Sequence, residues 1–158
     1  MNRALSILFI LAFFVSCNKE EAKKLTPELS GFTYSECGGF KSTFVAPTDS
    51  EIEKLTIRYE SDGYYKFDHT NVSFNCCLPA GISASLTLSG DTLFLNEKET
   101  EPGNCRCMCI YDLTSEIKNL DDGNYVLCLM KDSIMRGTIT LLFNKSMYEE
   151  ILISELIE

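Results

Sequence analysis

The chain has 158 residues, of which 45% are hydrophobic and 11% aromatic, so it carries enough apolar side chains to fold around a core. Its formal net charge is −9, with acidic residues scattered along the sequence. This composition excludes a disordered chain, and the negative charge disfavours binding to nucleic acid or to anionic lipid.

The N-terminus predicts a secretory signal that is removed from the mature protein. Arg3 supplies a positive charge, an apolar run of 11 residues follows over 5–15, and Ser16 is a small residue placed directly before Cys17. Such a run is too short to cross a bilayer, which needs about 20 residues. Residues 1–16 are therefore expected to be a signal peptide rather than a membrane span.

The residues around the expected cleavage point carry a more specific signal. Phe14-Val15-Ser16-Cys17 resembles the lipobox of bacterial lipoproteins, although the first position usually holds an aliphatic residue rather than Phe. The resemblance implies that Cys17 becomes the first mature residue and carries acyl chains such as palmitate. Two or more such chains hold a protein stably at a membrane surface.

Residues 17–30 are polar, contain one proline and show no apolar period, so they predict a flexible tether. Lys19-Glu20-Glu21 in this tether resembles the short charged signal that directs lipoproteins of the Bacteroidota to the outer face of the outer membrane. Removal of 16 residues from 158 leaves 142, which is the size of one domain. The folded domain is expected over residues 31–158.

The domain is predicted to be built from strands. Turn signals at Ser61-Asp62-Gly63 and Gly90-Asp91 indicate hairpins, because glycine tolerates the positive φ of tight turns. Alternating or β-branched runs predict strands over 55–58, 64–69, 82–89, 92–97, 105–117, 126–130 and 137–143.

Tyr125 follows a turn in the pattern Leu-x-x-Gly-x-Tyr at the entry to a strand. This pattern is similar to the tyrosine corner of immunoglobulin-like and fibronectin type III domains, where the Tyr hydroxyl bonds back to the backbone. The alternative is an ordinary strand Tyr after a turn. With seven or more short strands, the fold class predicted is all-β, an antiparallel immunoglobulin- or fibronectin type III-like β-sandwich.

The C-terminus shows a different period. Ser146 and Glu149 match a capping box, and the apolar residues that follow fall near one helical face, so we expect a short C-terminal helix. An edge strand over 150–157 is the alternative.

Seven cysteines follow Cys17, and an envelope location favours disulfide bonds among them. On a strand, the alternating cysteines of the run 105–117 point the same way with Cα atoms about 6.7 Å apart, so each needs a partner elsewhere. Bonds from the adjacent Cys76-Cys77 pair to this run are the simplest solution, and Cys37 and Cys128 can supply another link. An odd count leaves at least one thiol unpaired. The disulfide candidates are Cys37, Cys76, Cys77, Cys105, Cys107, Cys109 and Cys128.

A soft-metal site is the rival interpretation of these cysteines. The three alternating thiolates, with Cys76, Cys77 or His69 nearby, are ligand types that suit Cu(I) or Zn²⁺. In-line residues on a flat strand converge poorly on one ion, so disulfides are favoured and no metal or cofactor is expected. His69, the only histidine, is predicted to be a strand residue.

Taken together, the motifs resemble a group of small hypothetical lipoproteins of the Bacteroidota. The resemblance covers about residues 55–131 and rests on Phe74-Asn75-Cys76-Cys77, Gly90-Asp91-Thr92, the run from Cys105 to Leu113, and the turn before Tyr125. It implies an outer-membrane lipoprotein, facing the surface or the periplasm, with a small β domain, and it implies no activity.

No enzyme is expected, because a single histidine leaves little room for general base chemistry. The predicted function is a lipid-anchored, disulfide-stabilised binding or scaffolding module of the cell envelope, whose partners are the membrane and an envelope protein or glycan. A periplasmic thiol-based metal-binding or redox protein is the alternative.

Overall fold

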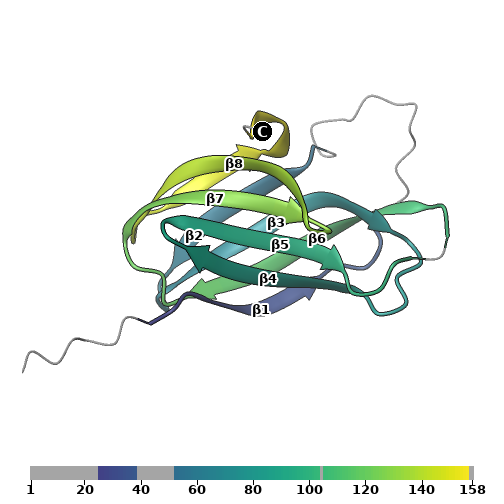
Figure 1. The fold of residues 1–158 in the computed structure, drawn as a ribbon, viewed down its shortest axis with the longest axis horizontal. Coiled ribbons are helices and arrows are strands. Elements are labelled where there is room, and N and C mark those ends of the chain that lie inside the picture. Colours follow the sequence, from purple (N-terminus) through teal and green to yellow (C-terminus); the bar gives the residue numbers. More distant parts are fainter. Residues whose placement is uncertain (1–24, 39–51, 104, 157–158) are drawn as a thin grey trace, which may run out of the picture.

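The computed structural model describes residues 25–38, 52–103 and 105–156, and this part of the chain forms two β-sheets (Figure 1). The strands form where β-branched, aromatic and leucine side chains alternate with polar ones, as the sequence predicts. In chain order they are β1 (Glu28–Tyr34), β2 (Lys54–Glu60), β3 (Tyr64–Asn75), β4 (Ile82–Ser89), β5 (Thr92–Glu99), β6 (Met108–Lys118), β7 (Gly123–Lys131), β8 (Ile134–Phe143) and β9 (Tyr148–Leu152), followed by the short 3₁₀ turn η2 (Ile153–Glu155).

The five-stranded sheet has the order β1-β6-β3-β2-β9 and the four-stranded sheet has the order β4-β5-β7-β8. The all-β, two-sheet architecture predicted from the sequence is therefore confirmed. All neighbouring strands in these sheets are antiparallel except β5 and β7, which run parallel. Immunoglobulin and fibronectin type III sheets are antiparallel, so the finer resemblance to those folds is not confirmed.

Two tight turns have the positive φ values that short hairpin loops require. Gly90 joins β4 to β5 with a φ of 63°, and Ser89 pairs with Thr92 across the loop, as expected from Gly90-Asp91. Asp132 and Ser133 join β7 to β8 with φ values of 51° and 65°, and both central residues of a type I′ turn need positive φ.

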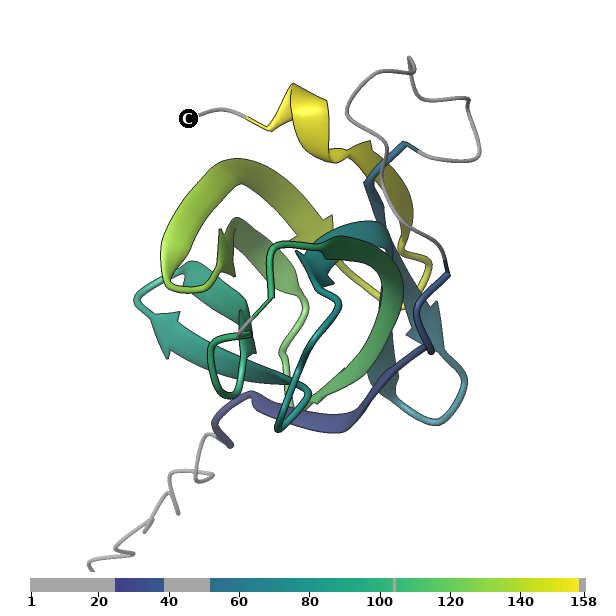
Figure 2. The ribbon, with the colours of Figure 1, turned by 90° about the vertical axis from the view of Figure 1, so that its right-hand side faces the viewer.

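The main core lies between the two sheets, which wrap around a common interior when viewed from one end (Figure 2). Phe143 on β8 is fully buried, and its ring centroid lies 5.0 Å from that of Tyr65 and 5.6 Å from that of Tyr125, both edge to face. Leucines of the four-stranded sheet, among them Leu93 and Leu95 on β5, belong to the same core cluster as these rings.

A second, smaller core cluster fills the other end of the sandwich. It contains Val72, Phe74, Ile82, Cys109, Tyr111 and Leu113. Inward positions on β3 change from odd to even numbers between the two clusters, because the register with β6 shifts between His69 and Val72. Asn71 sits in this shift with a φ of 61°, which asparagine tolerates better than most residues.

The C-terminal segment corrects one prediction. Residues 148–152 form the edge strand β9 on β2, so the expected helix is wrong, and only the single 3₁₀ turn η2 follows it. Ile151 of β9 is buried, and β9 is antiparallel to β2, whose edge supplies the hydrogen bonds of the strand. The Ser146 backbone and hydroxyl both donate to Asn144 Oδ1, so Ser146 stabilises a turn instead of capping a helix.

The first strand begins at Glu28, three residues before the predicted start of the domain at residue 31. Its first residue pairs with Lys118 at the end of β6, so the β1 backbone is already part of the sheet there. The predicted signal peptide, Cys17 and Lys19-Glu20-Glu21 lie outside the described residues. Within the described part, no helix is long and apolar enough to cross a membrane.

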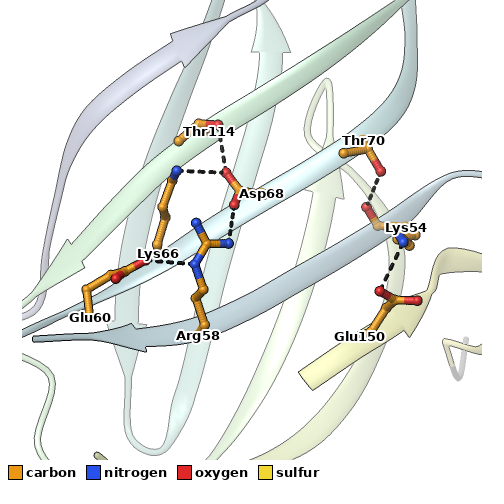
Figure 3. Close-up of polar contacts among 8 residues, drawn as sticks. All are labelled: Lys54, Arg58, Glu60, Lys66, Asp68, Thr70, Thr114 and Glu150. Carbon is orange, nitrogen blue, oxygen red and sulfur yellow. Dashed lines mark hydrogen bonds and ion pairs between the residues drawn. The ribbon is translucent and has the colours of Figure 1, made fainter. Parts of the chain in front are cut away.

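Charged side chains on β2, β3 and β9 pair across the outer face of the five-stranded sheet (Figure 3). Arg58 contacts Asp68 at 2.5 Å and Glu60 at 2.7 Å, and Lys54 contacts Glu150 at 2.9 Å. Partial burial alone would raise the pKa of Asp68, but the Thr114 hydroxyl and the Arg58 guanidinium outweigh it and lower that pKa. Cross-strand pairs of this kind fix register more than they add stability.

We predict that Phe143→Ala lowers the free energy of unfolding by about 3–5 kcal/mol, because it removes a fully buried ring and leaves a cavity between the sheets. Leu142→Ala is the matched control, since Leu142 is the preceding residue on β8 and is 57% exposed. Its effect should stay within about 0.5 kcal/mol. Chemical denaturation under non-reducing conditions measures both, and equal effects of the two variants would contradict the assigned core.

Candidate functional site

Six cysteines form three disulfide bonds at one end of the sandwich. The pairs are Cys37–Cys109, Cys76–Cys107 and Cys77–Cys105, with Cα atoms 5.6 to 5.8 Å apart. Two of them join the Cys76-Cys77 pair to the Cys-x-Cys-x-Cys run, as the sequence predicts. The suggested link between Cys37 and Cys128 is wrong, because Cys37 bonds to Cys109.

Cys128 is the unpaired cysteine of the described part of the chain. It lies on β7 between Leu127 and Leu129, which face the main core, so its side chain points to the other face of the four-stranded sheet. Its neighbours there leave it only 3% exposed. Burial raises the pKa of the Cys128 thiol. A buried thiol with a raised pKa is a poor nucleophile.

Cys105 and Cys107 do not lie on a strand, which corrects the expectation that β6 starts at residue 105. The strand begins at Met108, and the two cysteines occupy the loop before it. Their sulfurs lie 3.0 Å apart, whereas side chains two residues apart on a flat strand would be held roughly 6.7 Å apart. The bend therefore brings two thiols together that a strand would separate.

Cys76, Cys77, Cys105 and Cys107, which we call the cysteine cluster, have sulfur atoms that all lie within 4.8 Å of one another. The Cys76 sulfur lies 4.0 Å from that of Cys77 and 3.4 Å from that of Cys105, although it is bonded to Cys107. All four residues are half-buried. The two disulfides thus form one compact group of four sulfurs.

Asn75 holds the two segments of the cysteine cluster together. Its Nδ2 donates to the Cys105 carbonyl at 2.8 Å, and its Oδ1 accepts the Cys77 backbone N–H at 2.8 Å. The backbone N–H of Cys76 also donates to the Cys107 carbonyl at 3.2 Å. A side chain at Gly103 would collide with Asn75, so glycine is required where the loop passes it.

Glu99 on β5 joins the same loop to β3. One carboxylate oxygen accepts the Asn75 backbone N–H at 2.8 Å, and the other accepts the Gly103 backbone N–H at 3.1 Å. Hydrogen bonds to an ionised carboxylate are stronger than those between neutral groups. Sequence reasoning missed Asn75 and Glu99, and the only available signal was the position of Asn75 beside a cysteine pair.

His69 lies on β3 between the residues of that strand that belong to the two core clusters, and it is not part of the cysteine cluster. Its Nδ1 is 2.6 Å from Glu97 Oε2, and both residues are 3% exposed. This contact joins β3 of one sheet to β5 of the other. The His69 Nε2 is 3.3 Å from Glu53 Oε1, which is an ion-pair distance without hydrogen-bond alignment. Arg136 in turn contacts Glu53 at 3.1 Å.

Burial alone would lower the pKa of His69, but the charges of Glu97 and Glu53 outweigh burial and raise it to about 9. The ring is therefore an imidazolium at neutral pH, so two cations and two carboxylates balance in this group. Glu97 was not predicted, although its place in phase with the buried Leu93 and Leu95 is a signal that it points inward. Because solvent barely reaches His69, this group stabilises the fold rather than contacting a solute.

Tyr125, predicted to form a tyrosine corner, is buried with its ring edge to face with Phe143. Within the described residues its hydroxyl makes no backbone hydrogen bond of the kind that defines the corner. The hydroxyl of another core tyrosine, Tyr65, donates instead to a side chain, Asp122 Oδ1, at 3.5 Å in the turn before β7.

We predict that the protein loses stability as pH rises above neutral. The folded-state pKa of His69 is about 9 and the ordinary value is 6.5, so its contribution is complete below about pH 6.5 and disappears as pH rises through 9. The decrease should be about 3 kcal/mol at most. Denaturation midpoints measured across this range test it, and His69→Gln should flatten the profile. A wild-type stability that is constant from pH 6.5 to 9.5 would contradict the assigned ion group.

Alkylation tests the disulfide assignment among the seven cysteines from Cys37 to Cys128. The native protein should resist modification, because six of these cysteines are paired and Cys128 is buried. Unfolding without a reductant should expose only Cys128, and reduction should expose all seven. Peptide mapping by mass spectrometry identifies the modified positions, and labelling of any other cysteine in the unreduced protein would overturn the pairing.

The chain matches no family model, no curated protein and no solved structure. Its function is therefore argued from its own residues and their geometry.

Proposed function

We propose that this protein is a lipid-anchored lipoprotein of the bacterial cell envelope whose β-sandwich serves as a binding or scaffolding module. The anchor is the acylated Cys17 that follows the signal peptide, and the membrane is that of the outer envelope, with Lys19-Glu20-Glu21 favouring its outer face. The observation that carries the proposal is the combination of the lipobox-like segment with three disulfide bonds in the domain behind it.

The disulfide bonds support a location outside the cytoplasm. Disulfide bonds persist in oxidising environments outside the cytoplasm and are rare within it. Six of the seven cysteines in the domain are paired. Disulfide formation therefore involves nearly all of the cysteines of the fold rather than one regulated pair. The signal segment and the pairing are independent observations, because one lies in the leader and the other in the folded domain.

The position of β1 supports an orientation for the anchored domain. Glu28 pairs with Lys118 at the end of β6, whereas the cysteine cluster lies beside the start of that strand, at the opposite end of the sheet (Figure 1). Glu28 lies eleven positions after Cys17 (28 − 17), and a fully extended chain of that length reaches at most about 40 Å. The membrane-side end is then the one where β1 begins, and the cysteine cluster points away.

The outward end is suited to contact a partner in the envelope. Three disulfides fix the loops there, and a preorganised surface loses little conformational entropy on binding. Tyr34 and Met108 are 44% and 43% exposed at this end, beside the disulfide-bonded segments. A protein or glycan of the envelope fits this surface better than nucleic acid does, since the chain carries a net charge of −9.

The intact mass of protein purified from its native membrane tests the anchor. We expect the loss of residues 1–16, added acyl chains on the new N-terminal Cys17, and a mass six hydrogens below that of the reduced chain. Cys17→Ala is the matched control, because it removes the acceptor thiol and leaves the domain unchanged. It should yield an unacylated protein that detergent is not needed to extract.

Three results would contradict the proposal. An unacylated wild-type Cys17 would remove the anchor, and equal membrane retention of wild type and Cys17→Ala would show that something else holds the protein there. A mass equal to that of the fully reduced chain would show that the native protein has no disulfide bonds, which would contradict the proposed oxidising compartment.

A further inference from the structure

We propose that the cysteine cluster, when its two disulfides are reduced to thiols, is a tetrahedral four-thiolate site for Zn²⁺. This site is separate from the proposed anchoring and binding roles and does not depend on them. The observation behind it is the convergence of Cys76, Cys77, Cys105 and Cys107, whose sulfurs all lie within 4.8 Å of one another.

The spacing of the sulfurs matches that of a zinc site. Zinc–thiolate bonds of about 2.3 Å in a tetrahedron place the sulfurs about 3.8 Å apart. Between cysteines that are not bonded to each other, the separations are 4.0 Å for Cys76 and Cys77, 3.4 Å for Cys76 and Cys105, and 3.0 Å for Cys105 and Cys107. Changes of under about 1 Å bring these three separations to the zinc value. The sulfurs of each bonded pair must move apart by roughly 1.8 Å, from about 2.0 Å to about 3.8 Å, and reduction of the disulfide permits this movement.

The backbone around the cluster is held by hydrogen bonds that do not involve sulfur. Asn75 links to the Cys105 carbonyl and the Cys77 amide, and Glu99 links to the Asn75 and Gly103 amides. The Cys76 amide bonds the Cys107 carbonyl directly. The two ligand segments therefore remain side by side when the disulfides open, which preorganises the four thiols for one ion.

The main core should also remain folded when the two disulfides of the cysteine cluster are reduced. Apart from Met147 and Ile153, its buried residues lie on strands held by sheet pairing, and none of the four cysteines belongs to it. The His69–Glu97 contact also joins the two sheets. Cys76 touches only the edge of the smaller cluster. Opening the two disulfides therefore leaves most of the buried apolar surface in place.

Each disulfide accepts two electrons and two protons from one equivalent of a dithiol or phosphine reductant, so two equivalents give four thiols. Zn²⁺ then binds the four thiolates and releases four protons. The same thiols exist in the newly made chain before it is oxidised, so zinc and disulfide formation compete for one set of sulfurs.

Co²⁺ titration of the reduced full chain tests this site, with Cys17→Ser in every sample so that the N-terminal thiol does not interfere. The reductant is removed under anaerobic conditions before metal is added. We expect one equivalent of Co²⁺ to give the intense absorption of a tetrahedral tetrathiolate, and one equivalent of Zn²⁺ to abolish it. Zinc should also slow alkylation of the four cysteines by at least about tenfold, read cysteine by cysteine by mass spectrometry.

Two double variants separate the site from disulfide loss in general. Cys77→Ser with Cys105→Ser removes one disulfide and two proposed ligands, and it should lose the tetrathiolate spectrum. Cys37→Ser with Cys109→Ala also removes one disulfide and two cysteines, but these lie outside the cluster, so it should keep the spectrum. Circular dichroism of each reduced sample reports the β-structure with and without Zn²⁺.

Three results would overturn the proposal. One is the absence of a tetrathiolate spectrum in the reduced wild type, whether it is folded or not. Another is an equal spectrum in the two double variants. The third is zinc protection that falls on Cys37, Cys109 or Cys128 rather than on the cysteine cluster. None of these results bears on the acylation of Cys17, so this proposal and the anchoring proposal fail independently.

Discussion

The contact between His69 and Glu97 is the constraint on which the arrangement of the two sheets depends. The two side chains come from β3 and β5, they are both 3% exposed, and their charged atoms lie 2.6 Å apart. A charge buried without its partner costs several kcal/mol, so alternative packings that separate these residues are strongly disfavoured. Hydrophobic contacts alone would tolerate a sliding of one sheet on the other, whereas this pair permits one alignment. We infer that it contributes specificity of packing more than net stability.

That alignment also divides the interior into two parts with different means of stabilisation. On one side, Phe143 and the surrounding aromatic and leucine side chains bury a large apolar surface. On the other side, the smaller cluster around Phe74 and Tyr111 is supplemented by three disulfides. Sequence separations of 28 to 72 residues make these cross-links effective at restricting the unfolded chain. The disulfides are thus placed where the apolar core is smallest.

The sequence predicts the strands that carry a clean alternation, because one buried face imposes a period of two residues. The pairing between Cys76-Cys77 and the later cysteines is also as predicted, although the premise of in-line thiols is wrong for Cys105 and Cys107, which lie in the loop before β6. Three features escape this kind of reasoning. The β3 bulge at Asn71 reverses the inward face in mid-strand, the parallel neighbour of β5 depends on long-range topology, and β9 forms where an apolar period suggests a helix. Tertiary pairing with the free edge of β2 overrides local preference there.

The candidate site escapes prediction for a related reason. The decisive residues, Asn75 and Glu99, are polar side chains whose roles exist only when the loop before β6 folds back against the end of β3. Reasoning that placed Cys105 and Cys107 on a strand separated their sulfurs and made a metal site unfavourable. The bend removes that objection, because it brings the two sulfurs within 3.0 Å of each other.

The same geometry connects the site to the proposed location of the protein. The cysteine cluster lies at the end of the sandwich away from the start of β1, so a tether on β1 would direct it outward from the membrane. Half-buried sulfurs at an outward end are accessible to oxidants and to metal ions of the surroundings, whereas the fully buried Cys128 is accessible to neither. Oxidation of the cluster consumes the ligands that zinc requires, so the redox state of that compartment would decide whether the end of the domain is closed by disulfides or by a metal ion.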